Sequence, residues 1–181
     1  MRRNKGFSLI ELLIVVAIIL IIAAIAIPSL LRSRIAANDA ATAGSLRTIN
    51  TAQITYLSSY PAVGFSVSLL HLGPNGADCT NPAQIMSTNA CLIDETLGCS
   101  RSGPCKKNGF KYYITGPATR PAGDYVVSAG PESMGYSGDK DFCSFPDAVI
   151  RQTDPGTTAS VLSGPETPAN CINPSKYAPI Q

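Results

Sequence analysis

The chain has 181 residues, with 14 lysines and arginines against 12 aspartates and glutamates, and only 14% of its residues are charged. This length fits one folded domain. Arg2, Arg3 and Lys5 supply three of the basic charges, so the chain beyond them has 11 basic and 12 acidic residues, a formal charge of −1. A basic surface for nucleic acid is therefore not expected, and no nucleic acid is expected as a partner.

A long apolar segment follows the basic N-terminus. Leu12 to Leu31 are 20 consecutive residues without a charge, and a helix of that length is ~30 Å long, which matches the hydrocarbon core of a bilayer. One interpretation is a secretory signal peptide cleaved after Ala24-Ile25-Ala26, and another is a plain anchor helix. Glu11 argues against the signal peptide, because a carboxylate at the mouth of an apolar segment requires a partner.

A third interpretation comes from the residues before the apolar segment. The basic leader, Met1 to Gly6, is followed by Phe7-Ser8-Leu9-Ile10-Glu11. This pattern closely resembles the start of a type IV prepilin, residue by residue through about Pro28 and more generally through Tyr60. The resemblance implies that a membrane-embedded prepilin peptidase cleaves between Gly6 and Phe7 and that the new Phe7 amine is methylated. The mature chain would then have 181 − 6 = 175 residues.

Glu11 has two possible roles. On a helix it shares a face with Phe7, and its carboxylate lies where the helix dipole favours negative charge. The resemblance implies a second role, in which Glu11 pairs with the Phe7 ammonium of a neighbouring subunit and sets the register of a filament. Two charges 4 Å apart attract by ~4 kcal/mol at an effective dielectric constant near 20.

Pro28 lacks a backbone donor and clashes with the carbonyl four residues earlier, so a kink or a locally opened helix is expected around Ala24 to Pro28. The family also has a proline here. It often has a glycine eight residues earlier, where this chain has Leu20, so any unwinding of the helix in a filament is expected to start later or to be smaller.

Residues 32–60 are predicted to continue the helix with an amphipathic pattern. Apolar side chains fall within one arc at 100° per residue, and Asp39 interrupts this stripe near its start, so coverage by the head is expected only from about Ala43. No linker separates this part from the apolar segment, so Ser8 to Tyr60 is predicted as one long, bent helix. The stripe consists of Ile35, Leu46, Ile49, Tyr56, Leu57 and Tyr60.

The remaining residues, 61–181, are predicted to form a small β-rich head. A short helix is expected near Ser66 to Leu72. Phe110 to Thr115 and Asp124 to Ala129 are expected to form an antiparallel hairpin, and further strands are expected at Asp141 to Ser144 and Ala148 to Gln152. Residues 153–181 contain five prolines and are expected to form an extended tail attached only through Cys171.

Six cysteines lie beyond the apolar segment, and an even number in an exported, loop-rich domain predicts three disulfides. Short loops close most easily, which favours pairing between neighbours. Zinc is disfavoured because there is no C-x-x-C motif and His71 is far from any cysteine. The predicted pairs are Cys79 with Cys91, Cys99 with Cys105, and Cys143 with Cys171.

Motifs for catalysis are absent: the sequence has one histidine and neither a nucleophile elbow nor a phosphate-binding loop. An enzyme, a cofactor and a metal site are therefore not expected. Pseudopilins of type II secretion carry a calcium loop near the C-terminus, but the acidic residues of Asp139-Lys140-Asp141 are too closely spaced for a known loop. This tripeptide is predicted to be a solvated turn.

The expected fold is α+β, with a long bent N-terminal helix packed on a small antiparallel sheet with disulfide-stapled loops. The expected parts are a leader (1–6), a transmembrane and polymerisation helix (7–31), an amphipathic helix (32–60) and a head with an extended tail (61–181).

The resemblance implies a structural pilus subunit that begins in the inner membrane and ends in an extracellular filament. Its expected partners are other copies of itself, the prepilin peptidase/methylase and the pilus assembly machinery. Two alternatives stay open: a pseudopilin or a minor pilin for adhesion or DNA uptake, and a membrane-anchored binding domain that does not polymerise.

Overall fold

The computed structural model describes residues 7–99, 104–153 and 164–180. The fold is α+β, and the chain divides into two compact units. The N-terminal unit comprises residues 1–34 and the C-terminal unit comprises residues 35–181. The first helix, α1 (Leu9–Ser59), contributes residues to both units.

Helix α1 has 51 residues and begins and ends within one residue of the predicted bounds. Its first part consists almost entirely of Leu, Ile, Val and Ala, and its first turn contains Glu11. Pro61 follows the helix, and Gly64 has a positive φ of 81°. A side chain at Gly64 would meet the backbone of Ala122, whose carbonyl accepts the Phe65 N–H at 2.8 Å. Only glycine fits this close approach without strain.

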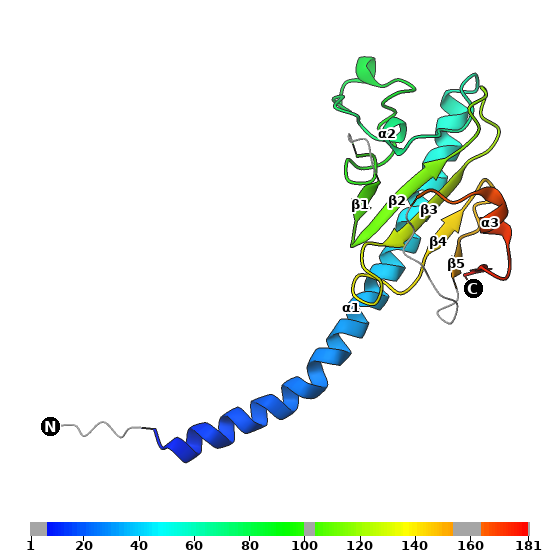
Figure 1. Cartoon of the computed structure of the whole chain (residues 1–181). Helices are drawn as coiled ribbons and strands as arrows, with labels where there is room; N and C mark the ends of the chain where they lie inside the picture. The colour runs from blue at the N-terminus through cyan, green and yellow to red at the C-terminus, as the bar shows by residue number, and fades with distance from the viewer. Residues whose placement is uncertain (1–6, 100–103, 154–163, 181) are drawn as a thin grey trace. The chain divides into compact units, whose positions relative to one another are not determined.

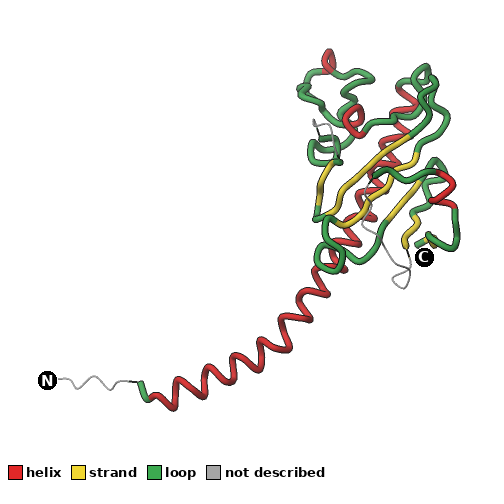
Figure 2. Tube along the Cα trace, in the orientation of Figure 1, coloured by secondary structure: helices red, strands yellow, loops and turns green. Residues whose placement is uncertain are grey.

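The C-terminal unit contains a six-stranded antiparallel sheet in which every strand pairs with its neighbour in sequence (Figure 1). The order is β1 (Cys105–Lys107), β2 (Phe110–Thr115), β3 (Val126–Pro131), β4 (Phe142–Ser144), β5 (Arg151–Thr153) and β6 (Tyr177–Pro179). The short helix α3 (Pro168–Ile172) lies between β5 and β6 in the chain. In the described residues between α1 and β1, α2 (Leu69–Leu72) and the 3₁₀ turn η1 (Pro82–Gln84) interrupt a long loop region (Figure 2).

The predicted strands are confirmed in part. The bounds of β2 are the predicted ones, whereas β3 begins two residues later than expected. Strand β1 was not predicted. It joins β2 through Asn108-Gly109, both with positive φ, which is the two-residue turn that suits a twisted hairpin.

Residues 153–181 were predicted to form an extended tail attached only through Cys171. This prediction is wrong for residues 164–180, the part of the tail beyond β5 that the structure describes. Residues 164–180, here called the C-terminal segment, contain α3 and β6. Strand β6 pairs with β5 in the register Thr153 to Tyr177, so backbone hydrogen bonds as well as the cysteine hold the segment. Pro179 lies at the end of this edge strand, where a missing donor is tolerated.

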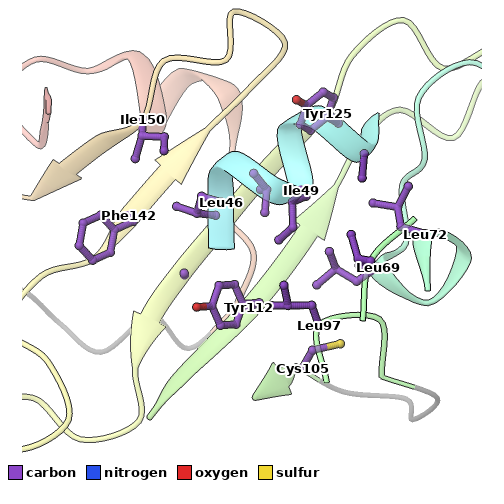
Figure 3. Close-up of a cluster of buried hydrophobic side chains, with 14 of the residues drawn as sticks. Leu46, Ile49, Leu69, Leu72, Leu97, Cys105, Tyr112, Tyr125, Phe142 and Ile150 are labelled. Carbon is purple, nitrogen blue, oxygen red and sulfur yellow. The ribbon is translucent and has the colours of Figure 1, made fainter. Parts of the chain in front are cut away.

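Residues 35–59 of α1 pack one face against the sheet and build the core with it (Figure 3). Leu46 and Ile49 are fully buried among Tyr112, Phe142 and other apolar side chains, while Ile54 on the other side of the helix is exposed. The predicted stripe is thus confirmed at its centre. It also includes Ile35, which is already buried, so the expectation that the head covers the stripe only from about Ala43 is wrong.

Polar side chains on the buried face of α1 bridge to the sheet and its loops. The Asn50 amide donates to Ser144 Oγ at 2.8 Å and its oxygen accepts from Tyr125 Oη at 3.0 Å. Gln53 donates to the Ser66 carbonyl at 2.7 Å and accepts the Ser66 N–H at 2.9 Å. These groups are satisfied, so their burial fixes the helix on the sheet without unpaired polar atoms.

The structure contains three disulfides, with the neighbour pairing predicted from the sequence. Two of them close loops of the region before β2. The third, Cys143–Cys171, joins β4 to α3 and is buried with Val126 and Tyr177 in a second, smaller apolar cluster.

Candidate processing and assembly site

Phe7 lies two residues before Leu9, the first residue of α1, and is 80% exposed. Gly6 lies outside the described residues, so the predicted cleavage site is described on its Phe7 side only. Cleavage at this point would leave the whole apolar part of α1 on the mature chain.

Ser8 and Glu11 form a local hydrogen-bonded cap at the start of α1. The Ser8 N–H donates to Glu11 Oε2 at 2.9 Å. This is one half of a capping box, in which a side chain three residues into the helix satisfies a backbone donor that has no partner within the helix. The spacing Ser-x-x-Glu is the sequence signature of this contact, which was not predicted.

The cap places the Glu11 carboxylate beside the end of the chain that processing would expose. Phe7, Ser8 and Glu11 are therefore brought together within one helical turn. The carboxylate is on the exposed surface of the single subunit, so it is also accessible to a neighbouring chain.

The apolar part of α1 exposes its large side chains all round. From Leu9 to Leu31, the bulky Leu, Ile and Val side chains are exposed, and no residue of the most apolar 18-residue stretch is buried. The mean hydropathy of that stretch is 3.3, so α1 is long and apolar enough to cross a membrane. Such a surface is stable only in lipid or against other apolar surfaces.

Pro28 lies within α1, which stays helical from Ala24 through Pro28. The locally opened helix considered from the sequence is therefore not seen in the single chain. A kink or an opening in an assembled filament stays a prediction.

In the described residues of the C-terminal unit, no group of three or more His, Cys, Asp and Glu side chains is placed to hold a metal ion. The single histidine, His71, is half-buried, and burial together with the charge of Arg120 lowers its pKa. The expectation of a solvated turn at Asp139-Lys140-Asp141 is wrong for Asp141, which is buried where β4 begins.

The comparisons with known proteins agree with the N-terminal geometry. Residues 1–27 match the model of the prokaryotic N-terminal methylation motif. The chain is 38% identical over 97 residues to the type IV wide pilus major component PilA4 of Thermus thermophilus, covering 51% of this chain and 74% of that relative. It is 46% identical over 56 residues to the type IV major pilin protein PilA of Myxococcus xanthus, covering 31% of this chain and 26% of that relative. No solved structure matches.

A methylation-motif N-terminus, an exposed apolar helix long enough to cross a membrane and a disulfide-bonded α+β unit together define a protein of the pilin class. The similarity to PilA4 extends over most of that relative's length. This chain belongs to the type IV pilin family.

Proposed function

We propose that the protein is a structural subunit of a type IV pilus, which polymerises through the apolar part of α1 into an extracellular filament. The observation that carries the proposal is the exposed apolar surface of α1 from Leu9 to Leu31, directly behind a methylation-motif N-terminus. The role is mechanical and not enzymatic.

The subunit begins in the inner membrane as a prepilin, with the apolar part of α1 spanning the bilayer. The prepilin peptidase cleaves between Gly6 and Phe7 and methylates the Phe7 amine. Because the cut precedes the apolar segment, the same helix first anchors the subunit and then packs against other copies, where the pilus assembly machinery inserts it.

Glu11 sets the register between subunits in this proposal. In the single chain its carboxylate accepts the Ser8 N–H, and a carboxylate has further lone pairs for a second donor. The Phe7 ammonium of a neighbouring copy supplies that donor and the opposite charge in an apolar environment, where the attraction is stronger than in water.

Electron microscopy of fibres sheared from cells, combined with mass spectrometry of their subunit, tests the proposal. We expect fibres whose main subunit is this chain, starting at methylated Phe7. A start at Ile27 would show that a signal peptidase removes the apolar helix, and a filament role would then be abandoned.

A minor pilin or a pseudopilin shares the same N-terminus, so abundance separates these alternatives. If the chain occurs only in trace amounts in fibres built from another subunit, the minor role is correct. If it stays in the membrane fraction under conditions that produce fibres, it is a non-polymerising anchor domain.

A further inference from the structure

Asp141 is buried at the start of β4 in a position that its backbone fixes. Its N–H donates to Thr153 Oγ1 at 2.9 Å, and its carbonyl accepts the Thr153 N–H at 2.9 Å. The residue is 2% exposed. Among the side chains of residues 7–99, 104–153 and 164–180, Asp141 Oδ1 is the buried nitrogen or oxygen atom that lacks a hydrogen-bond partner. A buried carboxylate oxygen without a partner is unfavourable when it is charged.

The C-terminal segment contributes a second buried carboxylate, Glu166, which is 5% exposed. Lys176 Nζ donates to Glu166 Oε1 at 2.6 Å, and Tyr177 Oη donates to the same oxygen at 3.2 Å. Asn170 donates to Glu166 Oε2 at 2.9 Å. Glu166 is therefore held as a carboxylate by three donors of its own segment.

The charged and titratable groups around Asp141 lie on the C-terminal segment and on the chain next to Asp141 itself. From the C-terminal segment these are Glu166, Lys176 and the Tyr177 phenol. Lys140 is the neighbour of Asp141 in the chain, and its Nζ donates a hydrogen bond to Gln152 Oε1 on β5 at 3.1 Å. Among the described residues, Lys176 is thus the ammonium that acts on both carboxylates, and it already binds Glu166.

One ammonium cannot neutralise two buried carboxylates. If both carboxylates were ionised, two buried negative charges would face one ammonium whose side chain is 42% exposed, and the cluster of Asp141, Glu166 and Lys176 would hold a net charge of −1. A proton on Asp141 makes the cluster neutral. Burial, opposed by Lys176 and reinforced by Glu166, raises the pKa of Asp141 to about 7.

We propose that the C-terminal segment is a proton-linked latch, closed over a neutral Asp141 and loosened when Asp141 loses its proton. The movable part is the segment that carries Glu166, α3 and β6. Opening it lets water reach the Asp141 carboxylate, so the open state favours the charged form. The Cys143–Cys171 disulfide keeps the segment attached to β4, which makes the opening local and reversible.

Hydrogen exchange on the full mature chain in detergent micelles tests the latch. Exchange of residues 164–180 is measured between about pH 5.5 and about pH 8.5, with correction for the intrinsic rate of each peptide. If the open-state pKa is 3.8 and the closed-state pKa about 7, the opening equilibrium increases about 30-fold across this range. We expect the protection of the segment to fall by up to that factor, while peptides from β2 keep theirs.

Asp141→Asn keeps the shape of the side chain but cannot ionise, so its segment should show protection that does not change with pH. Asp39→Asn is the matched control, because it removes a half-buried carboxylate with a raised pKa outside the segment and should leave the pH dependence of the segment as in the wild type. Constant protection in the wild type, or an unchanged slope in Asp141→Asn, would overturn the proposal.

Carbon-13 NMR of the Asp141 carboxyl in the wild-type chain gives a measurement that does not depend on the variant's folding. A midpoint near pH 7 supports the latch. A midpoint below about pH 5 would mean that Asp141 is charged in the closed state, and the latch would be rejected.

Discussion

Glu11 accepts a hydrogen bond in its own chain and carries a charge for the proposed contact with a neighbour. Glu11→Gln separates these two properties, because the amide oxygen can still accept the Ser8 N–H but has no charge. We expect the subunit to accumulate in the membrane with a folded C-terminal unit, yet fibre yield should fall more than tenfold when it is the only copy, since an ion pair worth ~4 kcal/mol is lost. Sheared-fibre yield, measured against membrane-fraction subunit, gives the result.

Glu11→Ala removes both the charge and the cap, and should reduce fibre yield at least as much. Asp39→Asn removes a carboxylate elsewhere on α1 and serves as the control with wild-type yield. Normal fibres from both Glu11 variants would mean that the register is set by apolar packing alone.

Ile49 and Ile54 offer a matched pair on one helix, because they have the same side chain and opposite exposure. Ile49 is 0% exposed and Ile54 is 49% exposed. Ile49→Ala should lower the free energy of unfolding by about 2–5 kcal/mol, since it leaves a cavity in the core, whereas Ile54→Ala should change it by less than about 0.5 kcal/mol. Denaturant unfolding of the full chain in micelles measures both. Equal effects would contradict the placement of the core.

Some buried side chains of α1 could be predicted from the sequence, and others could not. The apolar stripe of α1 could be predicted, because hydrophobic periodicity depends on helix geometry alone. The buried amides of Asn50 and Gln53 could not, because their partners come from residues 66, 125 and 144. Asp141 was misassigned for the same reason: its burial depends on a segment that folds over it from far along the chain.

At the scale of elements, the three disulfides should contribute unequally. Cys143–Cys171 spans 28 residues and Cys99–Cys105 spans 6. In the chain-entropy model, the longer loop gives about 3.6 kcal/mol and the shorter about 2.2 kcal/mol. Paired Cys→Ser variants should therefore destabilise the C-terminal unit in that order while α1 stays helical, as measured by denaturant unfolding followed by circular dichroism.

Reduction of the wild-type chain offers an independent check, because Cys143 and Cys171 are completely buried. Alkylation should reach them only after the unit unfolds. Six thiols that react freely in the exported protein would contradict the disulfide assignment.

The strands differ in how strongly their own sequences favour the strand conformation. Strand β2 has six residues rich in Tyr and Ile and was predicted with its bounds. Strand β6 has only three residues, one of which is a proline, so its own preference for the strand conformation is weak. Its structure depends on pairing with β5 and on the nearby disulfide. Strand β1 had a signal that was overlooked, since Asn108-Gly109 is a strong hairpin marker.

At the scale of the whole molecule, stability should depend on pH through two carboxyls with raised pKa values. Burial raises the pKa of Asp39 to about 6, although the Asp139 N–H opposes the shift, and the pKa of Asp141 is about 7. Between about pH 4 and about pH 7, the folded chain holds protons that the unfolded chain releases. The free energy of unfolding contributed by both groups should therefore fall as the pH rises through this window.

The double variant Asp39→Asn, Asp141→Asn should gain stability relative to the wild type as the pH rises from about 4 to about 7. The opposing contribution of His71, whose pKa is lowered by burial and Arg120, cancels in this comparison because both proteins contain it. Denaturant unfolding at several pH values checks the trend. A stability difference that stays constant with pH would show that neither carboxyl titrates in this window.

The unbroken order of the sheet, with each strand beside its sequence neighbour, has a kinetic consequence. Each strand pairs with the next strand along the chain, and this neighbour pairing favours rapid formation of the sheet because the loop entropy lost before each pairing is small. A chain delivered across a membrane from its anchored N-terminus can pair each strand with the one before it. If the strands add in chain order, β6 joins last, and the carboxyls of Asp141 and Glu166 lose contact with water only in that final step.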